Sequence, residues 1–241
     1  MSIKIGNLDV SSFKVGSADC RVYLGDTCVY SGDTPTPTHE YVEIAGTKWA
    51  TMNIGANSVT DTGLYFQWGD ISGYTADQVG SGEGQKYFGW ADYKYGNGTS
   101  SPGDTGMTKY NATDGLTTLE ASDDAARANW GGSWRMPTKD EFVALGSAVN
   151  TAWTSSYNSS GVAGLVCTDK TDSSKVLFFP AAGNCRNGSV GDVGKFGGYW
   201  SSSLFDNVIA AFYLNIYLGS VGWNYHKFYR HYGYTVRPVV N

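Results

Sequence analysis

Short runs of strand-favouring residues, separated by turns rich in glycine and asparagine, make up most of the sequence. Residues 175–183, 197–203 and 210–218 are examples, and residues 64–70 predict a short aromatic strand. Residues 70–115 show little periodicity and predict long surface loops. Glycine supplies 32 of the 241 residues and only 16% are charged, which favours a loop-rich α+β or all-β protein over a helical bundle. We expect an α+β class.

Two segments carry helix signals. In residues 122–130, Ser122 stands where an N-cap belongs, acidic residues follow in the first turn, and glycines close the segment. The second helix begins after a proline with a capping box between Thr138 and Glu141. We expect Gly146 to end this second helix.

The chain divides at a proline- and threonine-rich stretch. Residues 1–32 predict a small N-terminal β-hairpin module with a tight turn at Gly25-Asp26, and residues 33–38 predict an extended linker. Residues 39–241 are long enough for one domain with a substantial core. A module of about thirty residues buries little surface, so we expect it to form a homo-oligomer or to dock on a larger assembly.

The four cysteines carry no metal-binding signature. They are Cys20, Cys28, Cys167 and Cys185. The predicted turn places Cys28 opposite Tyr23 and Cys20 opposite Ser31, so the first two cysteines cannot form a disulfide with each other. For the other two, a disulfide and a pair of free buried thiols both remain open.

The charge and the apolar runs exclude some classes of partner. A net charge of −5 argues against a nucleic-acid-binding surface, and the longest apolar runs are too short to insert in a membrane. No charged segment followed by an apolar one opens the chain, so no signal peptide is expected. The tail differs from the rest, because residues 199–241 contain Lys227, Arg230 and Arg237 against Asp206, a net charge of +2.

The tail is also densely aromatic. Twelve of the 36 residues from position 199 to position 234 are Phe, Trp or Tyr, against 15% overall. Alternation places Phe212, Leu214 and Ile216 on a core face. It places Tyr213 and Tyr217 on the opposite face, where exposed tyrosines would suit recognition. The alternative is a buried aromatic sheet or an oligomer interface.

An ordered set of motifs resembles a known family. The motifs are GTKWATMNIGA (46–56), YFQWGD (65–70), DDAARANWGGSWRMPTKDEFVAL (123–145), FFPAAG (178–183), GYWSSS (198–203) and GYTVRPV (233–239). Together they resemble the bacterial Fibrobacter major paralogous domain group, which is related to formylglycine-generating enzymes. The resemblance covers about residues 40–241. It implies a C-type-lectin-like fold with two helices, short antiparallel strands and long loops.

Within that group, residues 199–239 resemble the variable region of target proteins of diversity-generating retroelements, in which mutagenic reverse transcription rewrites chosen codons. The fixed frame of that region is matched by Leu214, Arg230 and Gly233, and by the segments YWSSS (199–203) and VRPV (236–239). The sequence RVYLGDTCVYSG, near the N-terminus, resembles modules in tail-associated proteins of gut bacteriophages. The resemblance implies a protein of phage or prophage origin, located in the phage tail of the virion or at a cell surface.

The expected function is therefore non-catalytic recognition of a bacterial cell-surface protein or glycan. The residues expected to bind this ligand are Phe205, Val208, Ile209, Tyr213, Tyr217, Trp223, Asn224, Tyr225, His226, Phe228, Tyr229, His231 and Tyr232. The competing interpretation is a structural or oligomerisation subunit whose aromatic tail packs against a neighbouring chain.

Catalysis and metal-dependent binding are disfavoured by missing residues. No cysteine follows Cys185, so the redox-active pair of a formylglycine-generating oxidase is absent and we expect no enzyme. Tyr225 stands where a calcium-dependent lectin needs Asp, and His226 and His231 would lie on opposite faces of a strand. We expect no cofactor, and a structural calcium ion in the Asp-rich loops remains an open alternative.

Overall fold

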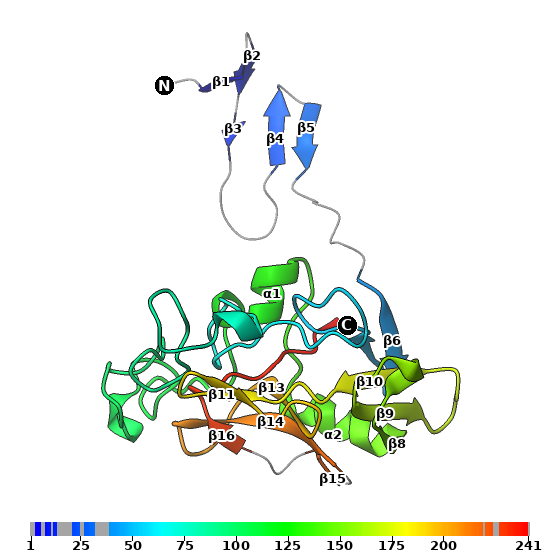
Figure 1. Cartoon of the computed structure of the whole chain (residues 1–241). Helices are drawn as coiled ribbons and strands as arrows, with labels where there is room; N and C mark the ends of the chain where they lie inside the picture. Colours follow the sequence, from blue (N-terminus) through cyan, green and yellow to red (C-terminus); the bar gives the residue numbers. More distant parts are fainter. Residues whose placement is uncertain are drawn as a thin grey trace. The chain divides into compact units, whose positions relative to one another are not determined.

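The computed structural model describes residues 39–218, 220–223 and 227–240, and the backbone of five short strands before them (Figure 1). The chain separates into two compact units, Met1–Thr38 and His39–Asn241. The five strands of the first unit are β1 (Ile3–Ile5), β2 (Leu8–Val10), β3 (Ser12–Phe13), β4 (Arg21–Leu24) and β5 (Thr27–Ser31).

The first unit contains the predicted hairpin, formed by β4 and β5. Tyr23 pairs with Cys28, as the two-residue turn predicts. A register shift between Val22 and Tyr23 then brings Ser31 opposite Arg21, so the predicted pairing of Ser31 with Cys20 is wrong. A β-bulge of this kind inserts one unpaired residue, which no sequence period signals. Cys20 lies outside the described residues.

The second unit is a mixed α+β structure with mostly antiparallel sheets, which confirms the expected class. Its two α-helices are α1 (Ala125–Trp130) and α2 (Lys139–Ala148). Its strands are β6 (Tyr41–Ile44), β7 (Thr47–Ala50), β8 (Val149–Thr154), β9 (Gly164–Asp169), β10 (Val176–Pro180), β11 (Asn184–Arg186), β12 (Ser189–Gly191), β13 (Phe196–Leu204), β14 (Ala210–Tyr217), β15 (Ser220–Gly222), β16 (Lys227–Tyr229) and β17 (Val239–Val240). Four 3₁₀ turns, η1 (Ala76–Gln78), η2 (Asp104–Gly106), η3 (Ala121–Asp123) and η4 (Tyr157–Ser159), complete the set.

Three of its sheets organise the unit. In the first, β17 pairs with β7, so the last strand of the chain closes a sheet that the first strands of the unit begin. In the second, β9 lies between β8 and β10. In the third, β14 pairs with β13 along one edge and with β15 and β16 along the other (Figure 1).

The first helix begins later than expected. The residues around Ser122 form the turn η3, and the N-cap is Asp124, whose carboxylate accepts hydrogen bonds from the backbone of Ala126 and Arg127. The same carboxylate accepts the Met136 amide at 2.9 Å, so it joins the helix start to the segment before α2. Serine and aspartate are about equally good caps, and tertiary contacts decide between them.

The second helix has the predicted capping box between Thr138 and Glu141, but it does not end at Gly146. It continues to Ala148 and packs against β8, β13 and β14 (Figure 1). A Cβ at position 146 would lie 2.5 Å from the Trp223 ring. Gly146 therefore leaves space on the helix surface for that ring and does not end the helix.

Residues 64–70 are not a strand. Tyr65 and Phe66 make only isolated bridges, to Tyr74 and Tyr234 respectively. Apart from η1 and η2, residues 70–115 run as loops and turns, as predicted. The aromatic side chains of residues 64–70 serve the core instead, since Tyr65, Phe66 and Trp68 are fully buried.

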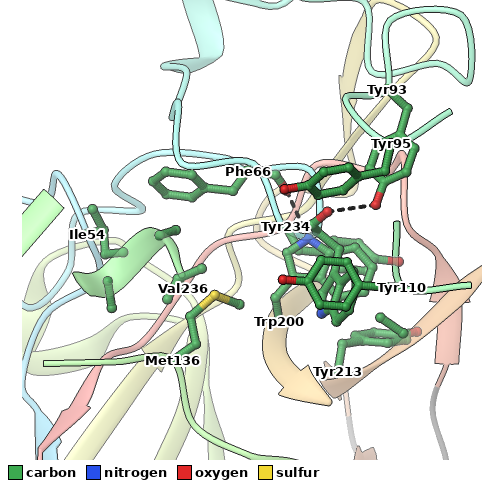
Figure 2. Packing of buried hydrophobic residues seen from close by; sticks show 14 of the residues in the cluster. Ile54, Phe66, Tyr93, Tyr95, Tyr110, Met136, Trp200, Tyr213, Tyr234 and Val236 are labelled. Atoms are coloured by element: carbon green, nitrogen blue, oxygen red, sulfur yellow. Dashed lines mark hydrogen bonds between the residues drawn. The ribbon is translucent and has the colours of Figure 1, made fainter. Parts of the chain in front are cut away.

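Two hydrophobic clusters enclose the β13–β14 pair, the first rich in aromatic rings and the second mainly aliphatic. Tyr199 and Trp200 are successive residues of β13, and they point into different clusters. Tyr213 and Leu214 divide in the same way on β14. Figure 2 shows the first cluster, where Trp200, Tyr213 and Tyr234 lie together. Because both faces of this strand pair are covered, side-chain alternation along it does not separate core from surface.

The contact between Gly146 and Trp223 gives a testable prediction. Gly146→Ala should lower the free energy of unfolding by about 1 kcal/mol or more, because the new Cβ overlaps the Trp223 ring. In a Trp223→Ala background the same change should raise it by up to about 1 kcal/mol, because alanine has the higher helix propensity. Urea unfolding of the four proteins measures both effects.

Ser147→Ala is the matched control, since Ser147 is the next helix residue and is exposed. Its effect should be the same with and without the Trp223 ring. An effect of Gly146→Ala that keeps its sign in both backgrounds would contradict the assigned role of this glycine.

Candidate functional site

The predicted binding residues fall into four groups in the structure. Tyr217 and Tyr229 are exposed, at 50% and 45% of their full accessibility. The half-buried residues are Phe205, Ile209, Trp223, Phe228 and Tyr232. The buried ones are Val208, Tyr213 and His231. Asn224, Tyr225 and His226 lie outside the described residues.

Tyr213 corrects the alternation argument. Its side chain was expected to be exposed, but only 6% of it is accessible. The ring stacks on Tyr234, with centroids 4.7 Å apart, and meets the edge of Trp200 at 6.0 Å (Figure 2). Burial raises the pKa of its hydroxyl, which bonds to Asn215 at 3.1 Å. Tyr213 therefore supports the surface from below.

His231 is buried against other rings of the tail region. Its ring centroid lies 4.3 Å from that of Trp90 and 5.8 Å from that of Tyr229. Burial lowers its pKa to about 4, against a small opposing effect of Asp92. Its Nδ1 is buried without a hydrogen-bond partner in the described part of the chain. The neutral ring is therefore the form that the folded protein holds at neutral pH.

Arg230 fixes this part of the tail to the long loops. Its Nε donates to the Tyr93 hydroxyl at 2.7 Å, and its Nη1 donates to the carbonyls of Tyr110 and Val208 at 2.9 and 2.7 Å. Its Nη2 donates to the Lys109 carbonyl at 2.9 Å. The guanidinium is fully buried and makes no ion pair within the described ranges. Neutral oxygens and aromatic faces replace its hydration.

Arg237 is buried in the same manner. It donates to the Asn53 side chain and to the carbonyls of Ala50, Thr51 and Phe178 at 2.8–3.1 Å. Burial lowers its pKa to about 10. Two of the three cationic side chains of the tail are thus buried. The net charge of +2 for residues 199–241 therefore overstates the positive charge at the surface of the tail.

A pocket of about 380 Å³ opens beside strand β16. Its lining is mainly apolar and consists of Phe205, Asn207, Ile209, Ala210, Lys227, Phe228 and Tyr229. Four of these residues were predicted from the sequence. Asn207, Ala210 and Lys227 were missed, because their place in the pocket depends on the pairing of β16 with β14. That pairing has no signal in the sequence.

Two further hollows each share a side chain with this pocket, and a third shares one with the second of them. Phe205 also lines a polar hollow with Lys139 and Asp206. Phe228 also lines a hollow of about 330 Å³ whose rim carries Arg186 and Asp192, and Tyr217 is shared between that hollow and one beside Trp153. Each shared wall is a residue that the sequence predicted. The hollows therefore form one connected surface over the tail.

The described part of the structure contains no assembled metal site and no reactive thiol site. There, no group of three or more His, Cys, Asp or Glu side chains is placed to hold a metal ion. Cys167 and Cys185 are buried in separate clusters and form no disulfide with each other. Of the two alternatives left open by the sequence, the structure therefore has the free thiols. Burial raises the pKa of both thiols far above the usual range, which makes them poor nucleophiles.

Comparison with known protein families, curated proteins and solved structures gave no match to this chain. Within the described residues, the helices are too short or too polar for any of them to cross a membrane.

The role of Arg230 can be tested by a conservative substitution. Arg230→Lys should lower the free energy of unfolding by about 2–4 kcal/mol, because an ammonium has three donors and cannot reproduce the four bonds of the planar guanidinium. Urea unfolding gives the value. Arg127→Lys, at an exposed arginine of α1, is the control and should change it by less than about 0.5 kcal/mol. Equal effects of the two substitutions would show that the buried network contributes little.

His231 makes stability depend on pH. Its pKa is about 4 in the folded protein and 6.5 without burial, so the stabilisation is complete above pH 6.5 and is lost as pH falls towards 4. Between pH 7 and pH 4.5 the free energy of unfolding should fall by roughly 2–3 kcal/mol more in the wild type than in His231→Gln. Urea unfolding at several pH values measures the difference. Parallel pH profiles for the two proteins would refute this assignment.

Proposed function

We propose that the unit His39–Asn241 has a C-type-lectin-type fold and is a non-catalytic binding domain. Its C-terminal region is the diversified part of a retroelement target protein, and it recognises a protein or glycan on a bacterial surface. The first unit attaches this domain to other copies or to a larger assembly such as a phage tail. The resemblance of the ordered motifs, described above, supports the family and the setting.

The connected hollows over the tail are the observation that carries this proposal. Three predicted residues, Phe205, Phe228 and Tyr217, each form a wall between two neighbouring hollows. Large rings at such positions offer contact area at a low entropy cost. A change at one of them would reshape two hollows at once, so few substitutions would alter ligand choice.

Residues of the fixed frame in the proposed variable region stabilise the fold. Arg230 and Arg237 are buried and make four hydrogen bonds each. A Cβ at Gly233 would lie 2.5 Å from the Phe88 ring and 2.7 Å from the Cys185 Cβ, so only glycine fits there. The exposed tail residues Tyr217 and Tyr229 precede Arg230 in the chain and project to solvent. This separation suits a scaffold on which surface side chains are exchanged.

A structural subunit remains the second candidate, because some apolar side chains of the region are strongly exposed. Leu218 is 61% accessible and Val193 is 56% accessible, and Tyr217 adds to this apolar surface. Such side chains can anchor a partner, but they could equally pack against a neighbouring chain. The two functions differ in what a substitution should disturb.

We expect Tyr229→Ala and Tyr217→Ala to reduce binding to bacterial cells by about tenfold while the melting temperature changes by less than about 2 °C. The physical reason is that both rings are exposed and contribute contact area without supporting the core. Binding is measured by co-sedimentation of the labelled protein with a panel of bacterial strains, and assembly by light scattering. Tyr41→Ala, an equally exposed tyrosine on β6, is the control and should bind as the wild type does.

Loss of oligomers or a large fall in melting temperature in the Tyr229 and Tyr217 variants would favour the structural subunit. For the diversification itself, the 3′ end of the gene is sequenced across a population. Substitutions should concentrate at codons for exposed tail positions, next to a reverse transcriptase gene and a template repeat. Uniform variation along the gene would reject that part of the proposal.

A further inference from the structure

The only exposed cation in the described part of the tail is Lys227, since Arg230 and Arg237 are buried. Its Nζ lies over the Phe205 ring, 4.3 Å from the centroid. No carboxylate of the described residues lies within ion-pair distance of it. Lys227 therefore places at the surface a positive charge that no carboxylate of the described residues neutralises.

This charge stands at the rim of the apolar pocket beside β16. The pocket wall is formed by the side chains of Phe205, Ile209, Phe228 and Tyr229. A volume of about 380 Å³ is within the range of ligand pockets, and it is enough for one large apolar side chain. The apolar wall also keeps water away from the ammonium on one side, which strengthens its attraction for an anion.

Asn207 adds a hydrogen-bond donor to the same pocket. Its Oδ1 accepts the backbone amide of Ile209 at 3.1 Å, which fixes the side chain. Its Nδ2 has no partner among the described residues, and the residue is exposed. A free amide donor beside an apolar pocket suits the carbonyl group of a peptide.

The neighbouring hollow lacks this imbalance of charge. On the other side of Phe205, Lys139 pairs with Asp140 at 3.6 Å, and Asp206 lines the same hollow. Positive charge is matched by carboxylates there. The uncompensated cation and the apolar pocket coincide only at Lys227 within the described surface of the tail.

From this geometry we infer that the pocket binds an apolar side chain of an acidic peptide segment on the partner protein. The apolar side chain fills the space lined by Ile209 and Phe228, and a neighbouring carboxylate of the partner pairs with Lys227. This inference rests on the proposed binding function and narrows its ligand to a protein with exposed acidic segments. The net charge of −5 makes a general preference for acidic peptides unfavourable, so such a preference requires a local cation.

The test uses the full chain and two synthetic peptides, acetyl-Glu-Glu-Phe-Glu-Glu-amide and acetyl-Lys-Lys-Phe-Lys-Lys-amide. We expect the wild type to bind the acidic peptide about fivefold or more tightly than the basic one at low salt, and Lys227→Glu to reverse the order. Binding is followed by NMR shifts of the backbone amides of Ile209, Ala210 and Phe228. Lys195→Glu is the control, because Lys195 is exposed, lies outside this pocket and gives the same change in net charge.

A preference for the acidic peptide that Lys195→Glu keeps and Lys227→Glu reverses would support the inference. Equal binding of both peptides, a preference that survives Lys227→Glu, or shifts confined to residues outside the pocket would overturn it. The proposed function fails separately. If cell binding requires Tyr229 but is unchanged in Lys227→Glu, the surface is a binding site and the inference of an acidic ligand is wrong. If cell binding is unchanged in the Tyr229 and Tyr217 variants, the proposed function and this inference are both rejected.

Discussion

Two buried guanidinium groups, solvated by carbonyl oxygens instead of carboxylates, hold the second unit together. Arg230 joins the tail to the loop that carries Lys109 and Tyr110, and Arg237 joins it to the segment after β7 and to β10. A buried charge without a counter-ion is costly unless every donor finds an acceptor. The loops must therefore keep the conformations that present these carbonyls. Long loops without regular secondary structure can be well defined for this reason.

The same constraint explains why the tail tolerates an aromatic surface. The β13–β14 pair is covered on both faces by hydrophobic clusters, so its position does not depend on the side chains that reach solvent. β15 and β16 then attach to the outer edge of β14, and exposed rings lie at the end of β14 (Tyr217) and on β16 (Tyr229). The buried part of the sheet and its exposed part therefore meet along β14. A binding site on such strands can be precise although its own contacts with the core are few.

Local signals in the sequence predicted local structure well. The capping box of Thr138 and Glu141 and the pairing of Tyr23 with Cys28 each depend on a few neighbouring residues. Two of the errors arose where distant contacts decide. Tyr213 is buried because Tyr234, far along the chain, covers it, and Gly146 lies within a helix because Trp223 packs on it. The tail residues expected to bind a ligand range from exposed to buried, and alternation could not predict these differences in burial.

The pairing of β17 with β7 has a consequence for how the protein is made. The strand that completes the first sheet consists of the last described residues of the chain, Val239 and Val240, and Arg237 stands just before it. A chain that stops early, for example after a frameshift in the tail, would lack both the closing strand and one of the two buried guanidinium groups. Such a chain cannot complete its core, and exposed strand edges and apolar surface would direct it to degradation or aggregation. Because the exposed tail residues precede β17 in the chain, correct folding requires that the reading frame stays intact through them.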